Sequence, residues 1–502
     1  MRAATAVQMR AIDDAAVARD GEVVLMRKAG QAIASLVGRY ARAGPIVGVA
    51  GNGNNGGDVF AALAATDPAR KRIVYADPAV SGSPARTDAL ERARAAGVLV
   101  RPFPLDRTTL AEAGLLLDGV LGAKARLPLD ATASALVAAM NASGAPVLAI
   151  DVPTGCDPTT GALGETAIVA RATIALGAPK LGCFLEPGRS ATGELWCDDL
   201  GMLGKDAANC DDDSYVLTDV EFATLLPRRA ADADKRSAGA PLVVAGSTQF
   251  PGAAVLCARG AARAGAGYVT VAAPEGAAAS LRAHLVEQVV VSYDERNPLE
   301  SIGQISDLSN HCGALAIGPG LGLGEVMGQI VRGVIERTDL PIVADASALF
   351  HLSKHLDLLR DKRAVITPHA REFARLSGRG TVAPHDRLPR LRAFVAEHDV
   401  TTLLKGRTTL IADRSAVHLN PTGTPALATA GTGDVLTGII ATLLAQGLEP
   451  IDAARVGAYW HGRAGRLAAK DRPVGVIAGD LPDHLAAAAR PTAPPEGPIR
   501  IY

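Results

Sequence analysis

A glycine- and asparagine-rich segment, GNGNNGGDVF at Gly51–Phe60, lies between the apolar run Ile46–Ala50 and a helical pattern. Backbone amides at the start of a helix bind anionic groups such as a diphosphate, and glycines let such a ligand approach the main chain. The other interpretation is a glycine-rich turn in which Asp58 is an acidic residue of the first helical turn. The segment alone favours neither, because such patterns have many false positives.

Two more polar segments follow strand-like runs in the first half of the chain. DGVLGAK begins at Asp118 after a run that starts at Leu115, and DVPTG begins at Asp151 after the run 146–150. Ligands of open parallel sheets bind beyond the carboxyl ends of the strands. We therefore expect these segments and the glycine-rich loop to line one crevice, although Asp118 or Asp151 alone is more typical of a loop or capping residue.

A Gly-Thr-Gly-Asp turn at Gly431–Asp434 opens a long apolar helical pattern in the second half of the chain. Amides of such a turn, together with the helix dipole, would stabilise charge on a transferred phosphoryl group. Asp434 would then accept the proton of a substrate hydroxyl group. The alternative is a glycine turn with an acidic residue that favours the helix, but the long apolar helix makes the anion site the favoured interpretation.

Other loops of this half carry compatible chemistry. KGRTT at Lys405–Thr409 could bind a nucleotide through its lysine, amides and hydroxyl groups, and Gly318–Gly322 and Thr367–His369 also end strand-like runs. Taken singly, His369 is more typical of a hydrogen-bonded loop residue than of a catalyst, and Lys405 of a solvated side chain.

Strand-like apolar runs alternate with helical patterns along the whole chain, which predicts an α/β fold with parallel sheets buried on both faces. The alternation pauses around 206–220 (DAANCDDDSYVLTDV), so we expect a domain boundary near 205–220 and domains of 1–210 and 221–492. Several prolines in 490–502 predict a loose tail.

Composition excludes several classes of protein. The 502 residues include 51 Lys and Arg and 52 Asp and Glu, and this balance opposes binding to nucleic acid. The apolar fraction of 48% opposes disorder. Six cysteines without metal-ligand spacing predict a reducing cytoplasm. No apolar run approaches the ~20 residues of a membrane span, and Asp13 and Asp14 oppose a signal peptide.

The first half resembles the YjeF N-terminal family of NAD(P)H-hydrate epimerases. The resemblance extends over about the first 200 residues and rests on NNGGD at 54–58, Asp-x-x-x-Gly at 118–122, AIDVPTG at 149–155 and LMRKAG at 25–30. It implies a Rossmann-like three-layer domain that interconverts the R and S hydrates of NADH and NADPH with bound K⁺.

The resemblance also implies site residues. Contacts with the hydrate are expected from Asn54, Asn55, Gly56, Gly57, Asp58, Gly122, Ala123, Lys124, Ala125, Arg126, Leu127, Pro128 and Asp151. Oxygen ligands of K⁺ are expected from Asn55, Asp118 and Thr154, and the catalytic proton-handling group is expected to be Asp151, with Lys124 second. Val59 and Ala64 stand where the family usually has glycine and arginine; a binding or scaffolding module without catalysis is therefore the alternative.

The second half, from about residue 221 to about 490, resembles the ribokinase-like YjeF C-terminal family of NAD(P)H-hydrate dehydratases. The shared segments are GAA at 252–254, GAG at 265–267, GPG at 318–320, TPHAREFARL at 367–376, LKG at 404–406 and AGTGD at 430–434. The resemblance implies hydrate contacts from Ala253, Gly320, His369 and the catalytic Asp434. It implies nucleotide contacts from Lys405, Gly406, Arg407, Thr408, Thr409 and Gly433.

Together the two resemblances predict a bifunctional metabolite-repair enzyme. One domain would epimerise the hydrate, and the other would dehydrate the S form at the expense of ADP with Mg²⁺, forming AMP and phosphate. They imply small-molecule substrates, a homo-oligomer and no partner among membranes or nucleic acids. The alternative is a ribokinase-like small-molecule kinase with a non-catalytic N-terminal ligand-binding domain, because fold does not fix function.

Overall fold

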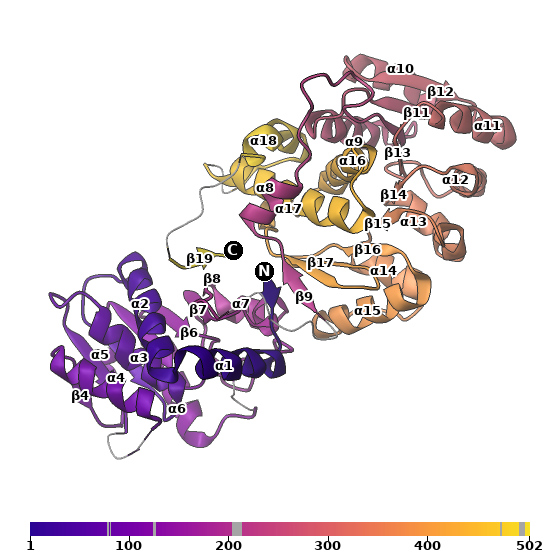
Figure 1. Ribbon diagram of the computed structural model, residues 1–502. Coiled ribbons are helices and arrows are strands. Elements are labelled where there is room, and N and C mark those ends of the chain that lie inside the picture. The colour runs from indigo at the N-terminus through magenta and orange to yellow at the C-terminus, as the bar shows by residue number, and fades with distance from the viewer. Residues whose placement is uncertain (78–79, 81, 124–126, 203–212, 472–473, 491–496) are drawn as a thin grey trace. The chain divides into compact units, whose positions relative to one another are not determined.

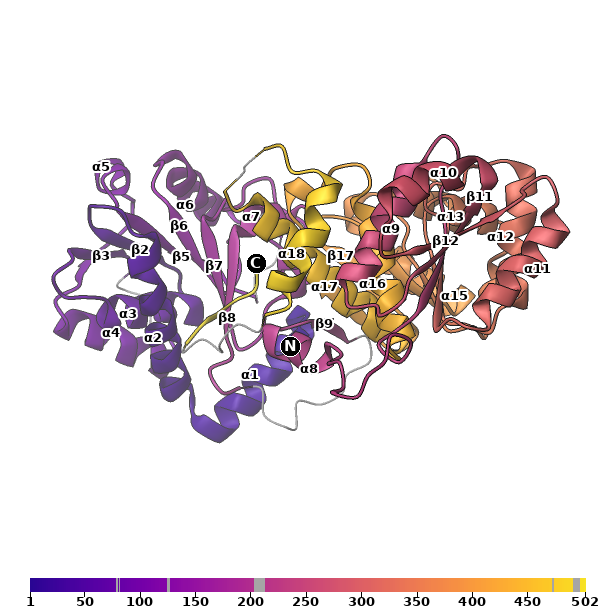
Figure 2. The same ribbon diagram turned by 90° about the horizontal axis from the view of Figure 1, so that it is seen from above.

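The computed structural model describes residues 1–77, 80, 82–123, 127–202, 213–471, 474–490 and 497–502. The chain divides into two compact units, one of Met1–Ser214 with Pro494–Tyr502 and the other of Tyr215–Ala493. Each unit is built on a mainly parallel sheet with helices packed against it (Figures 1 and 2), which confirms the predicted α/β fold. Among the described residues, no helix combines the length and the apolar character that crossing a bilayer requires.

The sheet of the first unit has the strand order β19-β8-β7-β6-β5-β2-β3-β4, and its neighbours are parallel except β19 with β8. The strands of this unit are β1 (Arg2–Ala3), β2 (Ile46–Ala50), β3 (Arg72–Tyr75), β4 (Leu99–Arg101), β5 (Leu115–Gly119), β6 (Val147–Ile150), β7 (Ala172–Leu176), β8 (Glu194–Asp198) and β19 (Ile499–Arg500). Its helices are α1 (Ala6–Asp20), α2 (Glu22–Tyr40), α3 (Asn54–Ala65), α4 (Pro84–Ala95), α5 (Arg107–Ala111), α6 (Ala131–Ala142), η1 (Leu181–Phe184) and α7 (Gly188–Thr192).

Apolar side chains cover both faces of this sheet. Helices α2, α3 and α4 cover one face, and α5 and α6 cover the other (Figure 2). On α2, Leu25, Ala29, Ile33 and Leu36 recur every three or four residues and are buried, so that they form one helical stripe against the sheet. Because both faces are covered, strands such as β2 (IVGVA) are apolar throughout rather than alternating.

The sheet of the second unit has the order β9-β18-β17-β16-β15-β14-β13-β10-β11-β12, parallel from β16 to β12 and antiparallel from β16 through β17 to β18. Its strands are β9 (Ser214–Val216), β10 (Pro241–Val244), β11 (Thr270–Pro274), β12 (Val289–Tyr293), β13 (Ala314–Ile317), β14 (Ile342–Ala344), β15 (Ala364–Ile366), β16 (Thr401–Leu404), β17 (Thr409–Ala412) and β18 (Val417–Asn420). Its helices are α8 (Asp219–Leu225), α9 (Pro251–Arg263), α10 (Glu275–His284), α11 (Pro298–Ser309), α12 (Glu325–Arg337), α13 (Ser347–Leu352), η2 (Leu356–Leu359), α14 (Ala370–Ser377), η3 (Pro384–Asp386), α15 (Arg387–His398), η4 (Pro425–Leu427), α16 (Thr432–Ala445), α17 (Pro450–Ala469), η5 (Ala478–Asp480) and α18 (Leu481–Ala488).

The end of the chain is not a loose tail, so that part of the sequence prediction was wrong. Strand β19 pairs antiparallel with β8, and Tyr502 is 7% exposed. The Tyr502 hydroxyl donates to the carbonyl oxygen of Cys183 at 2.5 Å, and the Arg189 guanidinium lies 3.8 Å from the centre of its ring. A buried aromatic ring and strand pairing therefore order this end despite the nearby prolines. The predicted tail also includes 491–496, and the predicted boundary near 205–220 includes 205–212; these residues lie outside the described ones.

Glycines let helix α16 approach α9 at backbone distance. A Cβ atom on Gly438 would lie 2.0 Å from the carbonyl oxygen of Cys257, and one on Gly260 would lie 2.5 Å from that of Val435. The facing atoms belong to the main chain and cannot move aside easily. This contact fixes the position of α16, the helix that the Gly-Thr-Gly-Asp turn begins.

We expect Gly438→Ala to lower the free energy of unfolding of the second unit by about 1–3 kcal/mol, since the added methyl group overpacks the α9–α16 contact. The matched control is Gly303→Ala in α11, where a Cβ would meet nothing within 4 Å. Better helix propensity should make this variant neutral or up to about 1 kcal/mol more stable. Urea unfolding followed by circular dichroism measures both, and equal stability of the two variants would contradict the packing argument.

Candidate functional site

The predicted polar loops of the second unit follow four neighbouring parallel strands. In the sheet, β16, β15, β14 and β13 lie side by side, and the residues directly after them are Lys405, Thr367, Asp345 and Gly318. The carboxyl ends of parallel strands meet at one edge, which is where ligands of such sheets bind. Asp345 directly follows β14, and its role in the site is visible only in the structure.

The predicted anion site begins helix α16. Gly431 has the left-handed conformation (φ +90°), and the helix starts at Thr432. The Thr432 carbonyl oxygen lies 2.9 Å from Nε2 of the buried His461. Burial lowers the pKa of His461 to about 4, so the ring is neutral at pH 7 and donates through Nε2. In the first turn the amide of Thr432 donates to the carbonyl oxygen of Thr429 at 3.4 Å and that of Asp434 to the carbonyl oxygen of Gly431 at 3.1 Å, and the positive end of the helix dipole favours a negative group beside them.

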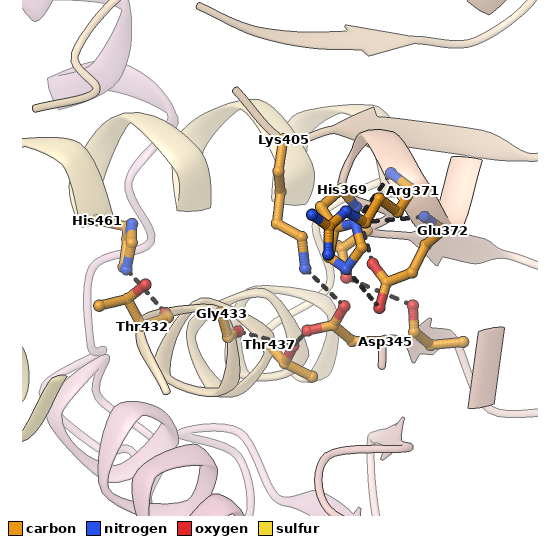
Figure 3. A network of polar contacts seen from close by, with 11 residues as sticks. Asp345, His369, Arg371, Glu372, Lys405, Thr432, Gly433, Thr437 and His461 are labelled. Atoms are coloured by element: carbon orange, nitrogen blue, oxygen red, sulfur yellow. Dashed lines mark hydrogen bonds and ion pairs between the residues drawn. The ribbon is translucent and has the colours of Figure 1, made fainter. Parts of the chain in front are cut away.

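A buried carboxylate links this helix to the lysine of the KGRTT loop (Figure 3). Asp345 is 2% exposed, and its Oδ1 accepts a hydrogen bond from Lys405 Nζ at 2.8 Å. Its Oδ2 accepts one from Thr437 Oγ1, on α16, at 3.0 Å. Burial by itself lowers the pKa of Lys405, but the nearby carboxylates, Asp345 foremost, raise it overall. Lys405 is therefore a charged and positioned group, not a solvated one.

Asp434 lies in the first turn of α16 with an altered acidity. Burial raises its pKa to about 7, the carboxylate of Asp345 adds to this effect, and Lys405 opposes it. A carboxyl group with this pKa is a suitable general base near neutral pH, because it exchanges a proton readily with a substrate hydroxyl group.

A pocket of about 420 Å³ opens beside these groups. Five of the six predicted nucleotide-binding residues line it, namely Lys405, Gly406, Arg407, Thr409 and Gly433. The sixth, Thr408, is 3% exposed and is not among the lining residues. Apolar side chains such as Leu427 and Leu436 complete the wall, and such a mixture of apolar surface with few polar groups is typical of small-molecule sites.

The predicted hydrate contacts of this unit lie along the same strand edge. A Cβ on Gly320, which follows β13, would lie 2.8 Å from the Cβ of Ala253, so these two residues are brought together. His369 follows β15 and caps α14, where its Nδ1 accepts from the amides of Arg371 and Glu372 at 3.1 and 3.3 Å. This geometry agrees with the hydrogen-bonded loop residue that is typical of a lone histidine, and it leaves Nε2 beside Glu372 (Figure 3).

The glycine-rich loop of the first unit packs closely against the loop after β5. A Cβ on Gly51 would lie 2.0 Å from the carbonyl oxygen of Val120, and one on Gly56 would lie 2.0 Å from that of Gly51. Glycine is required at both positions for this reason. Helix α3 begins at Asn54, whose Nδ2 donates to Glu22 Oε1 at 2.6 Å.

Two of the three predicted K⁺ ligands contact each other. Asp118 is fully buried at the end of β5, where its Oδ1 accepts from Thr154 Oγ1 at 2.7 Å and its Oδ2 accepts from the Thr154 amide at 2.8 Å. The Thr154 hydroxyl also lies 3.2 Å from the carbonyl oxygen of Leu121. Burial raises the pKa of Asp118 to about 6, and the hydrogen bonds from Thr154 oppose this rise.

The third predicted ligand, Asn55, lies against the same loop. A Cβ on Gly122 would lie 3.1 Å from Asn55 Cγ, and the buried Nδ2 of Asn55 has no hydrogen-bond partner among the described residues. Carboxylate, hydroxyl, carbonyl and amide oxygens are thus grouped here, and a buried carboxylate needs a counter-charge. These residues fit a hard monovalent cation.

Asp151 is paired with a lysine that sequence analysis missed. Lys180, 1% exposed, pairs with Asp151 Oδ1, and the amide of Ala123 donates to Asp151 Oδ2 at 3.0 Å. Burial raises the pKa of Asp58 well above its usual range, Asp151 adds to this effect, and Lys180 opposes it. Asp58 is therefore close enough to Asp151 and Lys180 to interact with both electrostatically. Lys180 lies four residues beyond strand β7, and this position after an apolar run was its only signal in the sequence.

The remaining predictions for the first unit divide into three groups. Gly57 packs against the side chain of Met26, while Leu127 lies near Gly164 and Pro128 follows it through a cis peptide bond. Lys124, Ala125 and Arg126 lie outside the described residues.

Val59, which replaces the family's glycine, does not occupy the ligand side of its loop. Its two methyl groups point at the sheet, where Cβ atoms on Gly48 and Gly119 would lie 2.3 and 2.2 Å from them. The glycines of β2 and β5 therefore leave the room that this larger side chain needs, and Val59 is fully buried there.

The raised pKa of Asp434 has a consequence for stability. In the folded chain this carboxyl group has a pKa of about 7, whereas its ordinary pKa is 3.8. The folded state therefore keeps the proton longer than the unfolded state as pH rises from about 4 to 7, and the contribution of Asp434 to the free energy of unfolding decreases over that range. We expect the stability advantage of Asp434→Asn over wild type to grow between pH 4 and pH 7. Urea unfolding at both pH values measures it, with the exposed Asp339→Asn as control. A constant difference would contradict the raised pKa.

Comparison with known proteins gives matches over both units. Residues 22–182 match the family described as YjeF-related protein N-terminus, and residues 241–487 match the family described as NAD(P)H-hydrate dehydratase. Among solved structures, an ADP/ATP-dependent NAD(P)H-hydrate dehydratase from Bacillus subtilis, co-crystallised with ATP and Mg²⁺, is 31% identical with a TM-score of 0.48, covering 55% of this chain and 97% of that one.

Relatives resemble the chain over nearly its whole length. A bifunctional NAD(P)H-hydrate repair enzyme Nnr from Moorella thermoacetica is 34% identical over 484 residues, which are 92% of this chain and 91% of the relative. The enzyme of the same name from Mycobacterium tuberculosis is 37% identical over 467 residues, 90% of this chain and 89% of the relative. The chain therefore belongs to the family of bifunctional NAD(P)H-hydrate repair enzymes.

Proposed function

We propose that the second unit dehydrates the S hydrate of NADH or NADPH at the expense of ADP, and that the first unit interconverts the R and S hydrates. The observation that carries the first part is Asp434, a carboxyl group with a pKa of about 7 in the first turn of α16, beside the pocket lined by Lys405 and Gly433. The family membership supports both parts. The proposal makes the chain a metabolite-repair enzyme.

In the dehydratase step, ADP would occupy the 420 Å³ pocket with its phosphates near Lys405 and the amides of α16. Asp434 would accept the proton of the hydrate's hydroxyl group as its oxygen attacks the terminal phosphorus of ADP, and AMP leaves with the electrons of the broken P–O bond. The phosphorylated oxygen then departs as phosphate, with loss of a ring proton, which regenerates the dihydronicotinamide ring. Phosphate is a far better leaving group than hydroxide.

Mg²⁺ is proposed to accompany ADP. The carboxyl group of Asp434, in the first turn of α16 beside the pocket, has oxygen atoms of the kind that Mg²⁺ binds together with substrate phosphates. When bound, the ion neutralises phosphate charge. The chain's own groups bind the phosphates and accept the proton: Lys405 and the start of α16 lie near the phosphates, and Asp434 takes the proton.

In the epimerase step, Asp151 would give a proton to the hydroxyl group of the hydrate as that group leaves. It would take a proton back when the hydroxyl group is restored. Asn54–Asp58 and the segment 122–128 would hold the hydrate beside it. K⁺, bound by Asn55, Asp118 and Thr154, would supply positive charge next to the phosphates of the hydrate or next to the glycine-rich loop. The grouped oxygen atoms and the buried Asp118 carboxylate support this assignment.

We also propose that the chain acts in a reducing cytoplasm and as a homo-oligomer. The five cysteines among the described residues are free thiols, which supports a reducing compartment. Support for the homo-oligomer comes from the family resemblance.

The experiment that tests the proposed function follows absorbance at 340 nm from a mixture of R and S hydrates with ADP and Mg²⁺. Wild type should recover both epimers faster than they exchange spontaneously. Asp151→Asn should recover the S form alone, and Asp434→Asn should recover neither, because loss of a general base typically lowers the rate by about 100-fold or more. The exposed Asp339→Asn is the control. Accumulation of a stable phosphorylated product would favour the kinase alternative instead.

The proposed K⁺ site predicts a separate dependence. Replacing K⁺ by choline should slow the conversion of R to S hydrate and leave the dehydration of S hydrate unchanged. Asp118→Asn should raise the K⁺ concentration for half-maximal epimerisation by about tenfold or more. The exposed Asp14→Asn, in the same unit, should not. Equal epimerase rates in K⁺ and choline would remove the metal from the proposal.

A further inference from the structure

The buried lysine of the first unit has a place that neither resemblance assigns. Lys180 is 1% exposed, pairs with Asp151 Oδ1 and donates to the carbonyl oxygen of Leu176 at 2.7 Å. Lysine is almost never fully buried unless it is paired. Burying such a pair brings little stability, since apolar residues of similar size commonly serve as well or better. A role beyond folding is therefore the more economical explanation.

The main chain around Lys180 is fixed on both sides. Ala4 donates its amide hydrogen to the carbonyl oxygen of Pro179 at 2.8 Å, and its own carbonyl oxygen accepts from the amide of Leu181 at 2.9 Å. The N-terminal segment thus holds the backbone of Lys180 in place. A lysine fixed at its backbone and at its ammonium group has lost nearly all its conformational freedom.

The partner carboxylate is fixed as firmly. Asp151 has a positive φ of 71°, which is unfavourable for a residue other than glycine and is typically kept at functional sites. Its Oδ2 accepts from the amide of Ala123, in the segment predicted to contact the hydrate. The Asp151 side chain is nevertheless 15% exposed, whereas Lys180 is closed off. A ligand in this site can therefore touch Asp151 but reaches Lys180 only through it.

We propose that Lys180 acts through Asp151 in the epimerisation: it holds that carboxylate in place and lends it the proton that the departing hydroxyl group takes. Lys180 is in this sense a positioning residue, and Asp151 is the group that touches the substrate. The inference rests on the proposed epimerase function of the first unit.

The proton balance of the step is closed. The ring nitrogen supplies electrons as the C–O bond breaks, the oxygen keeps the bonding pair, and one proton passes from Lys180 through Asp151 to form water. This leaves a neutral lysine, an ionised Asp151 and a cationic ring. Water then adds to the opposite face of the ring carbon, and its proton returns through Asp151 to Lys180. Nothing is oxidised or reduced, and no other reactant is needed.

The other titratable groups that face the pair come from three elements. Asp58 lies on α3, Cys183 on η1 and Cys197 on β8, and each interacts electrostatically with Asp151 and Lys180. Burial raises the pKa of both thiols, so they stay neutral across the range from pH 6 to pH 8. Changes in a pH profile on removal of Lys180 therefore do not arise from these thiols.

The test uses the full chain and measures conversion of purified R hydrate to S hydrate at pH 6 and pH 8, corrected for spontaneous exchange. Lys180→Met should lower kcat by about 100-fold at pH 8, with KM little changed. The loss should be clearly smaller at pH 6, because the higher proton concentration then replaces part of what Lys180 supplies. Dehydration of S hydrate by the second unit should equal wild type, and the exposed Lys71→Met is the matched control.

A second pair of variants keeps the test decisive if Lys180→Met does not fold. The double variant that combines Asp151→Asn with Lys180→Met leaves neither partner as an unpaired buried charge. The epimerase rate of this double variant should equal that of Asp151→Asn alone. A further drop in the double variant would show that Lys180 works independently of Asp151 and would overturn the inference. Full activity of Lys180→Arg would also overturn the proton role, since a guanidinium group does not give up its proton.

Failure of the inference and failure of the proposed function give different results. If wild type dehydrates S hydrate but does not accelerate the conversion of R to S, the epimerase function itself is wrong. If wild type epimerises and Lys180→Met does so equally fast at pH 8, the function stands and the role of Lys180 is wrong.

Discussion

In each unit a carboxylate that follows a parallel strand is paired with a lysine that follows another strand of the same sheet, and both sites depend on this pairing. Asp345 after β14 pairs with Lys405 after β16, and Asp151 after β6 pairs with Lys180 beyond β7. In each unit the pair joins two loops at the carboxyl edge of the sheet, so loop positions and charge are fixed together. The surrounding glycines, which allow main chains to approach closely, then determine how near a ligand can come.

Local signals in the sequence were sufficient for the fold class and for much of the second site. The apolar run before Gly51 is β2, and the Gly-Thr-Gly-Asp turn begins α16, because strand burial and helix initiation depend on residues close in the chain. The KGRTT loop likewise follows β16 and lines a pocket. His369 is a hydrogen-bonded loop residue that caps α14, as is typical of a lone histidine.

The parts that sequence analysis missed all depend on distant residues. Lys180 is an ordinary lysine in the sequence, and only the sheet order brings it to Asp151. Asp345 gains its role through Thr437, which is 92 residues away. Val59 is accommodated by glycines of two strands, a fit between three positions that no local pattern contains. The prolines near the end of the chain gave a wrong prediction, because pairing with β8 outweighs their local effect.

Strand β19 has a consequence for the order in which the parts of the chain can fold during synthesis. The sheet of the first unit includes residues 499–500, so its edge beside β8 stays open until the ribosome has made all of the second unit. An unpaired edge strand is a site for wrong pairing with other chains. The nascent first unit is thus exposed to that hazard for some 300 residues of synthesis, which is on the order of 15–60 s at typical rates of translation. The second unit is, in effect, an insertion within the first.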